Sequence, residues 1–278
     1  MAWPSPAKIN LFLHVTAQRN DGYHEIQTVF QFLDYCDSLE FQIEQSTTLE
    51  LLTPVKGVKN ESNIILRAAK CLQSHTNSPQ GAKISIKKRL PIGGGLGGGS
   101  SNAATTLIAL NHLWKTKLTT NELAQLGLTL GADVPVFIHG YAAWAEGVGE
   151  ELTPILPAEP WYVIIVPDCQ VSTAEVFSSQ ELTRDCEPIT ISRFLSGEGE
   201  NICEGVVLKS YPAISQAVDW LNCYGKSRMS GTGACIFADF SSQVQAQQVL
   251  DNLPQNWQGF IAKGCNQSPL ATLMDLRN

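Results

Sequence analysis

The densest group of residues that could do chemistry is a glycine-rich segment between an expected strand and an expected helix. Glycine permits positive φ and a close approach of backbone to ligand, and the first amides of a helix carry a partial positive charge. We therefore favour a phosphate-binding loop over a merely flexible one. Its residues are Pro91, Ile92, Gly93, Gly94, Gly95, Leu96, Gly97, Gly98, Gly99, Ser100 and Ser101.

Three common nucleotide-binding patterns can be compared with this loop. A Walker loop ends in Gly-Lys-Ser/Thr, and no lysine lies between Pro91 and Ser101. The spacing Gly93-x-Gly95-x-x-Gly98 matches a dinucleotide fingerprint, but the helical pattern TTNELAQ replaces the second strand with its acidic residue. The catalytic-loop and DFG signatures of protein kinases are absent from the sequence. The loop therefore indicates phosphate binding in another fold.

Three polar residues elsewhere have types that suit a reaction site. Lys8 and Asn10 are two positions apart in an expected strand, so their side chains point to the same face. From the residues alone, however, Lys8 is more often a strand-end lysine with its ammonium in water, and Asn10 can be an ordinary polar residue of the strand. Asp133 precedes a short apolar segment, where a carboxylate is either a general base or a helix N-cap. From the residues alone, these two roles for Asp133 are about equally supported.

Two turns have compositions that suit binding. Tyr23 and His24 leave the turn Asn20-Asp21-Gly22, and aromatic side chains there either pack against the protein or stack on a ligand. The turn 230–233, Ser-Gly-Thr-Gly, either offers backbone amides to an anion or simply reverses the chain before a strand.

The elements that must position these residues alternate between strands and helices, which predicts an α+β protein. Alternating apolar residues predict a first hairpin, and a helix begins at Ser62 or Asn63. Thr119 and Glu122 form a capping box. The proline-rich segment LTPILPAEPW predicts a domain break near residue 153, giving domains 1–152 and 153–278. Further strands are expected at 83–90, 161–167, 234–240 and 259–264, and further helices at 100–114, 211–224 and 241–250.

Composition excludes several classes of function. The chain has 278 residues, 19 basic and 26 acidic, and a formal net charge of −7, so no basic field is available to bind nucleic acid. It lacks an apolar run of about 18 residues and a signal peptide, which predicts a cytoplasmic protein with no membrane partner. The eight cysteines lack metal-ligand spacing, so reduced thiols and no metal site are expected.

Three blocks of sequence resemble the GHMP small-molecule kinases: PAKINLFLHV at 6–15, RLPIGGGLGGGSSNAA at 89–104 and SGTGACIF at 230–237. With DGYH at 21–24 and LGADVPVF at 130–137, the resemblance spans nearly the whole chain. It implies an N-terminal ribosomal-protein-S5-like domain and a C-terminal ferredoxin-like domain. The expanded glycine loop and DGYH are similar to those of members that act on a cytidine-diphosphate-linked methylerythritol.

The resemblance assigns roles to individual residues. It implies that Asp133 is the general base, that Lys8 is its charged partner and that Lys88 and Asn63 lie near ATP, although Lys88 could equally be solvated. It further implies that the acceptor site is formed by Asn10, Tyr23, His24, Thr173 and Phe177, with rings that stack on cytosine and a histidine that binds its edge. Ala174 stands where a proline often follows the threonine.

The implied activity is ATP-dependent phosphorylation of the 2-hydroxyl of the cytidine-linked methylerythritol in non-mevalonate isoprenoid synthesis, with Mg²⁺ bridging the phosphates. This hydroxyl is a tertiary alcohol and a poor nucleophile, so a carboxylate that accepts its proton and a nearby cation would both help. The alternatives are another GHMP kinase acting on a sugar or mevalonate-like alcohol, and a non-catalytic nucleotide-binding module.

Overall fold

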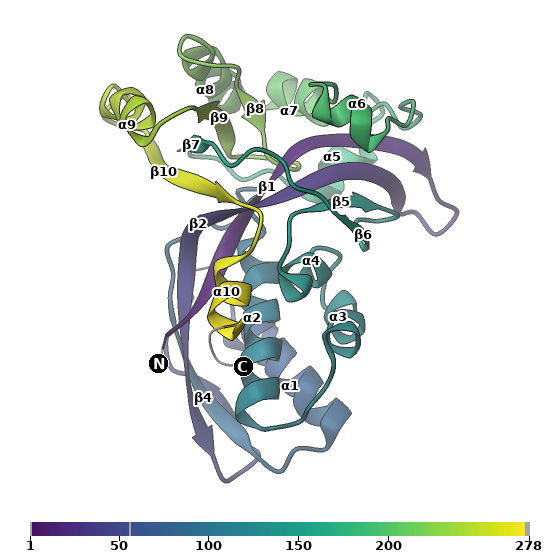
Figure 1. Cartoon of the computed structure of the whole chain (residues 1–278), viewed down its shortest axis with the longest axis vertical. Coiled ribbons are helices and arrows are strands. Elements are labelled where there is room, and N and C mark those ends of the chain that lie inside the picture. Colours follow the sequence, from purple (N-terminus) through teal and green to yellow (C-terminus); the bar gives the residue numbers. More distant parts are fainter. Residues whose placement is uncertain (1, 56, 276–278) are drawn as a thin grey trace.

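The computed structural model describes residues 2–55 and 57–275. Its central feature is a long antiparallel hairpin of β1 (Ala2–Gln18) and β2 (His24–Glu44), which extends through both parts of the molecule (Figure 1). Gly22 has a φ of +87° in the connecting turn, and the Asp21 carboxylate accepts a hydrogen bond from the Tyr23 amide. The predicted hairpin and its turn are confirmed.

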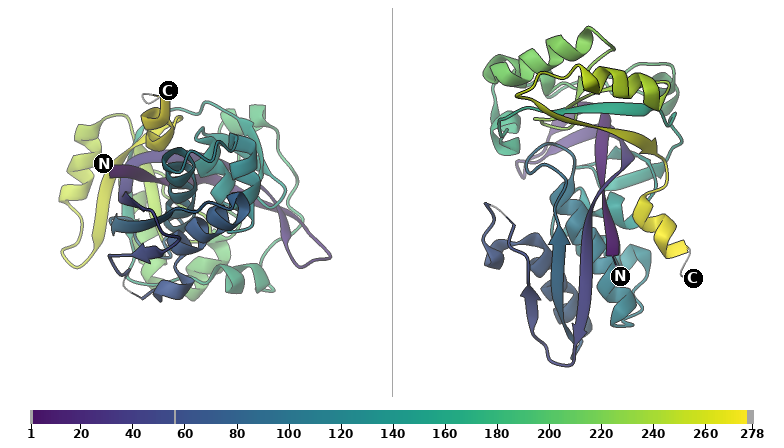
Figure 2. Two further views of the ribbon diagram at one scale, coloured as in Figure 1. Left: turned by 90° about the horizontal axis from the view of Figure 1, so that it is seen from below. Right: turned by 90° about the vertical axis from the view of Figure 1, so that its left-hand side faces the viewer.

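Helices cover one face of the N-terminal part of the sheet (Figures 1 and 2). Asn63 caps α1 by accepting a hydrogen bond from the Ile65 amide, and Thr119 and Glu122 form the predicted capping box of α3. Fully buried apolar side chains of α1 and α2, such as Leu72 and Leu107, face this core. The elements are β3 (Leu49–Leu51), η1 (Asn60–Ser62), α1 (Ile64–Thr76), β4 (Gly81–Lys87), α2 (Gly98–Leu113), α3 (Thr120–Leu128) and α4 (Val134–His139).

The second part of the chain continues the same sheet in the order β2-β10-β7-β9-β8. Its strands are β7 (Trp161–Val166), β8 (Arg228–Met229), β9 (Ile236–Phe240) and β10 (Gln258–Cys265). Before them in the chain, β5 (Ala143–Glu146) pairs with β2, and β6 (Glu151–Pro154) pairs with β5. The helices that lie around them are α5 (Thr173–Ser178), α6 (Ile191–Leu195), α7 (Glu204–Ser210), α8 (Pro212–Asn222) and α9 (Gln243–Asp251).

The chain end returns to the N-terminal part of the molecule. β10 pairs with β2 through Gly264 and Cys265, and α10 (Pro269–Asp275) then lies beside β1 (Figure 2). Between the two parts, β6 ends at Pro154 and β7 begins at Trp161. The α+β alternation is confirmed, whereas the exact domain break near residue 153 stays a prediction.

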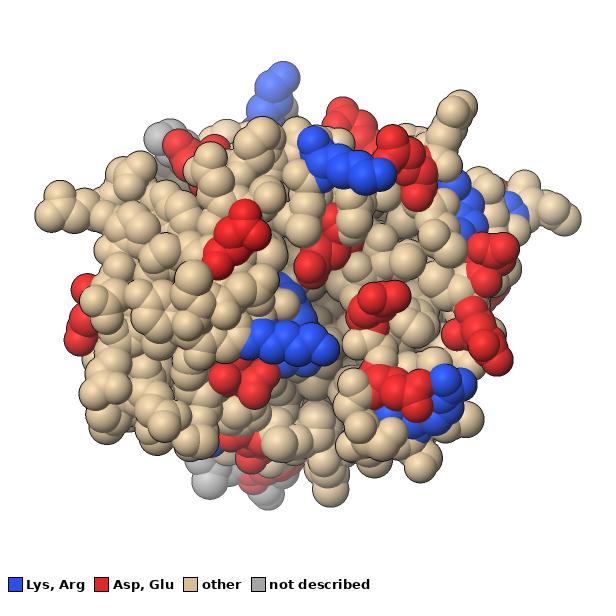
Figure 3. All heavy atoms as spheres, turned by 90° about the horizontal axis from the view of Figure 1, so that it is seen from above, with Lys and Arg blue, Asp and Glu red and all other residues tan. Residues whose placement is uncertain are grey.

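The charged side chains are dispersed on the face seen in Figure 3. Basic residues there stand singly or beside acidic ones, rather than in a continuous patch. Within the part of the chain that the structure describes, no helix has the length and apolar character that crossing a bilayer would require.

Candidate functional site

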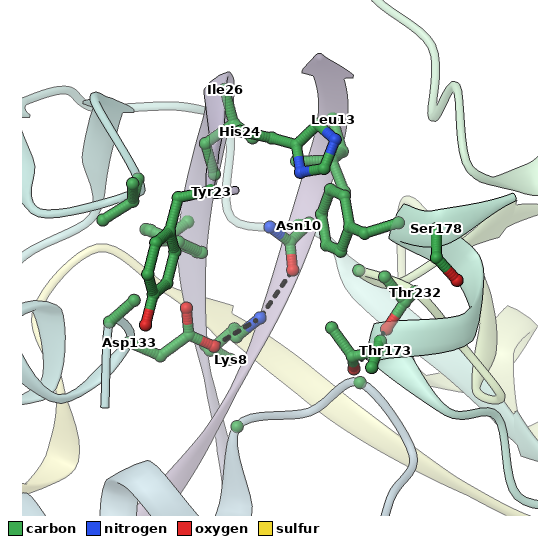
Figure 4. A pocket seen from close by; sticks show the side chains of 18 of the residues that line it. Lys8, Asn10, Leu13, Tyr23, His24, Ile26, Asp133, Thr173, Ser178 and Thr232 are labelled. Carbon is green, nitrogen blue, oxygen red and sulfur yellow. Dashed lines mark hydrogen bonds and ion pairs between the residues drawn. The ribbon is translucent and has the colours of Figure 1, made fainter. Parts of the chain in front are cut away.

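A cavity of about 610 Å³ opens between the β1–β2 hairpin, the glycine loop, the N-terminus of α4 and helix α5; we call it the hairpin cavity. In Figure 4, Lys8, Asn10 and Asp133 meet within it, with Tyr23 on one side and Thr173 and Thr232 on the other. The structure thus brings together residues from both halves of the chain. The predicted residues that line the cavity are Lys8, Asn10, Tyr23, His24, Gly95, Gly97, Asp133, Thr173 and Phe177.

Lys8 has a buried ammonium group, with only 4% of the side chain exposed. Its Nζ donates to Asn10 Oδ1 at 2.6 Å, lies 3.3 Å from Asp133 Oδ2 and sits 5.0 Å from the centre of the Phe30 ring. A buried charge is costly unless it is paired and hydrogen-bonded, and these three contacts meet that need. Lys8 and Asn10 share one face of β1, as their spacing predicted.

Asp133 occupies the N-cap position of α4, but its side chain makes no capping hydrogen bond. Instead, its carboxylate faces Lys8 and remains 34% exposed to the cavity. A carboxylate that makes no hydrogen bond to the helix amides can accept a proton from a bound ligand. The geometry therefore favours the reaction-site role over the capping role.

A second cavity of about 410 Å³, which we call the loop cavity, lies on the other side of the glycine loop. Gly95 and Gly97 line both cavities, so the loop is their shared wall. The predicted residues that line it are Asn63, Lys88, Pro91, Ile92, Gly93, Gly94, Gly95, Leu96, Gly97, Gly98, Gly99 and Ser100. Ser101 is not among them: its side chain is fully buried, and its hydroxyl accepts a hydrogen bond from Ser5.

Glycine is required at Gly97 for two reasons. Its φ is +68°, and a Cβ there would lie 2.8 Å from Phe137 Cζ and 3.1 Å from Lys8 Cε. A side chain at this position would therefore be strained and would press on the ammonium-bearing side chain of Lys8. The loop leads directly into α2, whose N-terminus has no side-chain cap, so its first amides remain available to an anion.

Asp37 holds the entrance to the glycine loop. Its carboxylate is fully buried and accepts hydrogen bonds from Lys88 Nζ at 2.5 Å, the Arg89 amide at 2.7 Å, the Leu90 amide at 2.8 Å and Asn102 Nδ2 at 3.0 Å. Lys88 is consequently fixed beside the loop cavity rather than free in solvent. Asp37 was not predicted as a site residue, because a carboxylate within a strand gives no local sign of partners about 50 residues away.

The hairpin turn and α5 form the opposite end of the hairpin cavity. The His24 and Phe177 rings are stacked, with centroids 5.0 Å apart and planes inclined by 28°, whereas Tyr23 is 63% exposed. Burial, and to a smaller extent the nearby Arg184 guanidinium, lowers the pKa of His24. His24 is therefore neutral at pH 7, with nitrogens that can donate or accept. Arg184 was another residue that sequence analysis missed.

The turn 230–233 lies beside the glycine loop, and its Gly231 and Thr232 line the hairpin cavity. Ser230 Oγ donates to the Gly95 carbonyl at 2.9 Å and accepts a hydrogen bond from the Asn10 amide at 3.2 Å. Thr232 and Thr173 share a hydrogen bond of 2.9 Å between their hydroxyls. The turn thus ties the glycine loop, β1 and α5 to one another. Ala174 lies in the first turn of α5 and lines the hairpin cavity.

Comparison with protein families matches both halves of the chain. Residues 63–141 match the GHMP kinases N terminal domain, and residues 188–259 match the GHMP kinases C terminal domain. A protein from Nitrosococcus oceani named 4-diphosphocytidyl-2-C-methyl-D-erythritol kinase is 57% identical over 275 residues, which cover 99% of this chain and 98% of that protein. A protein of the same name from a Shewanella species is 55% identical over 274 residues, 98% of this chain and 96% of that protein.

Solved structures agree with these matches. A crystal structure of 4-(cytidine 5'-diphospho)-2C-methyl-D-erythritol kinase superposes with a TM-score of 0.83 at 31% identity, covering 95% of this chain and 99% of that one. Methanococcus jannaschii mevalonate kinase, at 18% identity and a TM-score of 0.70 over 96% of this chain and 98% of that one, shares the fold. The predicted two-domain fold is thereby confirmed, and the chain belongs to the GHMP kinase family.

Proposed function

We propose that this protein transfers the γ-phosphoryl group of ATP to the 2-hydroxyl of 4-diphosphocytidyl-2-C-methyl-D-erythritol. The observation that carries the proposal is the Lys8–Asp133 pair beside Gly97, in the wall that the two cavities share. A phosphoryl group held by the loop would face an alcohol held in the hairpin cavity at this point. Relatives that are 55–57% identical over nearly the whole chain carry the name of this kinase, which supports the choice of substrate.

Asp133 would accept the proton of the 2-hydroxyl while the oxygen of that hydroxyl bonds to the γ-phosphorus of ATP. The bond from the γ-phosphorus to the bridging oxygen breaks, and ADP leaves. Lys8 would offset negative charge that develops on the transferred group, because its ammonium is held 3.3 Å from the Asp133 carboxylate. Amides of the glycine loop and of the first turn of α2 would bind the ATP phosphates.

Mg²⁺ would complete this arrangement in the loop cavity. A methyl group added to Gly131 would lie 3.8 Å from Ser100 Oγ, so this hydroxyl faces the segment that leads to Asp133. Mg²⁺ prefers oxygen ligands and keeps most of its positions for phosphate oxygens and water. A single hydroxyl therefore fits this ion, and Ser100 is the residue that would hold it. The ion would neutralise charge on the phosphates.

The cytidine end of the substrate would lie between the hairpin turn and α5. Phe177 offers a ring for stacking, His24 offers a hydrogen-bonding edge, and Tyr23 is exposed and able to cover a bound base. Thr173, at the start of α5, lines the same cavity as Lys8 and Asp133. The substrate would then bridge the base-binding end and the reaction centre.

An acceptor panel tests this proposal. The purified protein would be incubated with ATP, Mg²⁺ and, in turn, 4-diphosphocytidyl-2-C-methyl-D-erythritol, mevalonate and homoserine, and product phosphorus would be followed by ³¹P NMR. We expect a new phosphomonoester on the 2-oxygen of the cytidine compound alone. Preferred phosphorylation of another acceptor would overturn the substrate assignment, and no ATP-dependent product from any acceptor would overturn the kinase assignment.

A further inference from the structure

Arg184 links the imidazole of His24 to the end of helix α5. Its Nε donates to His24 Nε2 at 3.2 Å, and its Nη2 donates to the carbonyls of Phe177 at 2.8 Å and Ser179 at 2.7 Å. Its Nη1 donates to the Leu182 carbonyl at 3.0 Å. Carbonyl groups thus hold the guanidinium on two sides, and its remaining edge is directed at the histidine.

This contact determines which nitrogen of His24 carries the proton. A guanidinium can only donate hydrogen bonds, so Nε2 of His24 must accept and is unprotonated. In a neutral imidazole the single proton then lies on Nδ1. Among residues 2–55 and 57–275, Nδ1 has no hydrogen-bond partner, and His24 lines the hairpin cavity. The cavity wall therefore has a donor available for a ligand.

A fixed donor distinguishes one pyrimidine base from the other. Cytosine presents an acceptor at N3, whereas uracil presents an N–H donor there. A donor on the protein would form a hydrogen bond with cytosine N3. With uracil, the same donor would face the N–H at that position, and neither group would have an acceptor. Stacking on the Phe177 ring cannot make this distinction, because both bases offer a π-face.

We propose that Arg184 is a positioning residue that holds the His24 proton on Nδ1 and thereby sets the preference for cytosine over uracil. The proposal rests on the function proposed above, since it assumes that a cytidine group binds beside His24. Among the other charged groups near the turn, Arg19 lies 3.0 Å from Asp21 and 3.3 Å from Glu25 in ion pairs within the hairpin. Arg184 is the cation that acts on the imidazole directly.

The test begins with the parent protein labelled with ¹⁵N-histidine. Long-range ¹H–¹⁵N spectra distinguish the two neutral tautomers, and His24→Gln identifies the His24 signals. We expect Nδ1–H in the parent protein and a shift towards Nε2–H, with a higher His24 pKa, in Arg184→Met. Nε2–H in the parent would overturn the proposal without any arginine variant, even if Arg184→Met failed to fold.

Binding of cytidine and uridine diphosphates then tests the consequence. Calorimetry with ADP saturating the loop cavity would give the ratio of the two Kd values for parent, Arg184→Met, His24→Ala and the double variant. We expect Arg184→Met to reduce the preference for cytidine diphosphate about tenfold, the effect of one lost hydrogen bond, and to have no further effect in the His24→Ala background. Arg193→Met, which removes an exposed arginine that pairs with Glu198, is the matched control.

An unchanged preference in folded Arg184→Met would overturn the proposal, even if the tautomer had shifted. Because these measurements need no turnover, they are independent of the acceptor panel. If the acceptor panel fails but Arg184→Met still lowers the base preference, the proposed phosphorylation is wrong and the positioning role of Arg184 stands. If the panel succeeds but Arg184→Met leaves the base preference unchanged, the phosphorylation stands and the positioning role is wrong.

Discussion

Lys8 illustrates how a single side chain can be buried and yet remain available for chemistry. Its ammonium is enclosed by Asn10, Asp133 and the Phe30 ring, which come from β1, the start of α4 and β2. Asn10 is in turn fixed by a hydrogen bond of 2.9 Å to Thr28. The position of the charge is therefore set before substrates arrive, so the proposed phosphoryl transfer would need little reorganisation at Lys8.

Lys8→Met should separate this chemical role from a structural one. Methionine fills similar space without charge, and Asp133 is exposed enough to regain water, but the buried Asn10 Oδ1 loses its donor, so the free energy of unfolding should fall by about 1–3 kcal/mol. Loss of the cation should lower kcat by about 10²- to 10³-fold. Steady-state kinetics and urea denaturation would be compared with Lys70→Met, a substitution at an exposed position of α1. Parent-like kcat in Lys8→Met would remove Lys8 from the reaction.

The glycine loop is anchored by hydrogen bonds from several other elements. The Leu96 carbonyl accepts a hydrogen bond from the Lys8 amide at 3.0 Å, and the Gly94 carbonyl accepts one from the Cys235 amide at 3.1 Å. Ser230 holds Gly95, and Asp37 holds the residues just before the loop. These hydrogen bonds hold the glycine-rich loop in one conformation. The loop therefore loses its conformational entropy when the protein folds, before any ligand binds.

Gly97→Ala should disturb both the hairpin cavity and the loop cavity, because the glycine loop lines both. The added methyl meets Phe137 and Lys8 at a positive φ, so we expect KM for ATP to rise and kcat to fall, each by about tenfold, with a loss of about 1–3 kcal/mol in stability. Gly205→Ala is the matched control, because Gly205 lies in α7 with open space around its Cβ position. If Gly97→Ala retained the parent KM for ATP, the loop would not be the phosphate site.

Across the whole chain, local sequence patterns predicted the helices and strands better than the contacts between them. The hairpin turn, the capping box of α3 and the strand-loop-helix order around Gly97 depend on neighbouring residues, so the sequence alone was sufficient. Asp37 and Arg184 depend on partners up to 160 positions away. Pairing of β10 with β2 joins residues more than 200 positions apart, and no periodicity in either strand indicates it.

Three histidines are expected to make the free energy of unfolding depend on pH. Burial lowers the pKa of His14, His24 and His139, so the unfolded chain binds more protons than the folded protein as the pH falls below about 6.5. Glu204, whose pKa burial raises, acts in the opposite direction but is a single group. We therefore expect the free energy of unfolding to be lower at pH 5.5 than at pH 7.5.

Urea denaturation at the two pH values would measure this difference. His14→Gln provides a direct comparison, because glutamine does not titrate and should make the stability less dependent on pH. Equal or greater stability of the parent protein at pH 5.5 would show that burial of these histidines does not control its response to acid.

Steady-state kinetics of Asp133→Asn with ATP and 4-diphosphocytidyl-2-C-methyl-D-erythritol would show whether Asp133 accepts the proton of the acceptor alcohol. Asparagine preserves the shape of the side chain but is a far weaker base. We predict that kcat falls by about 10²- to 10⁴-fold while both KM values stay close to those of the parent protein. Asp219→Asn, at an exposed position of α8, should leave kcat unchanged. A folded Asp133→Asn protein with kcat near the parent value would show that Asp133 is not the base.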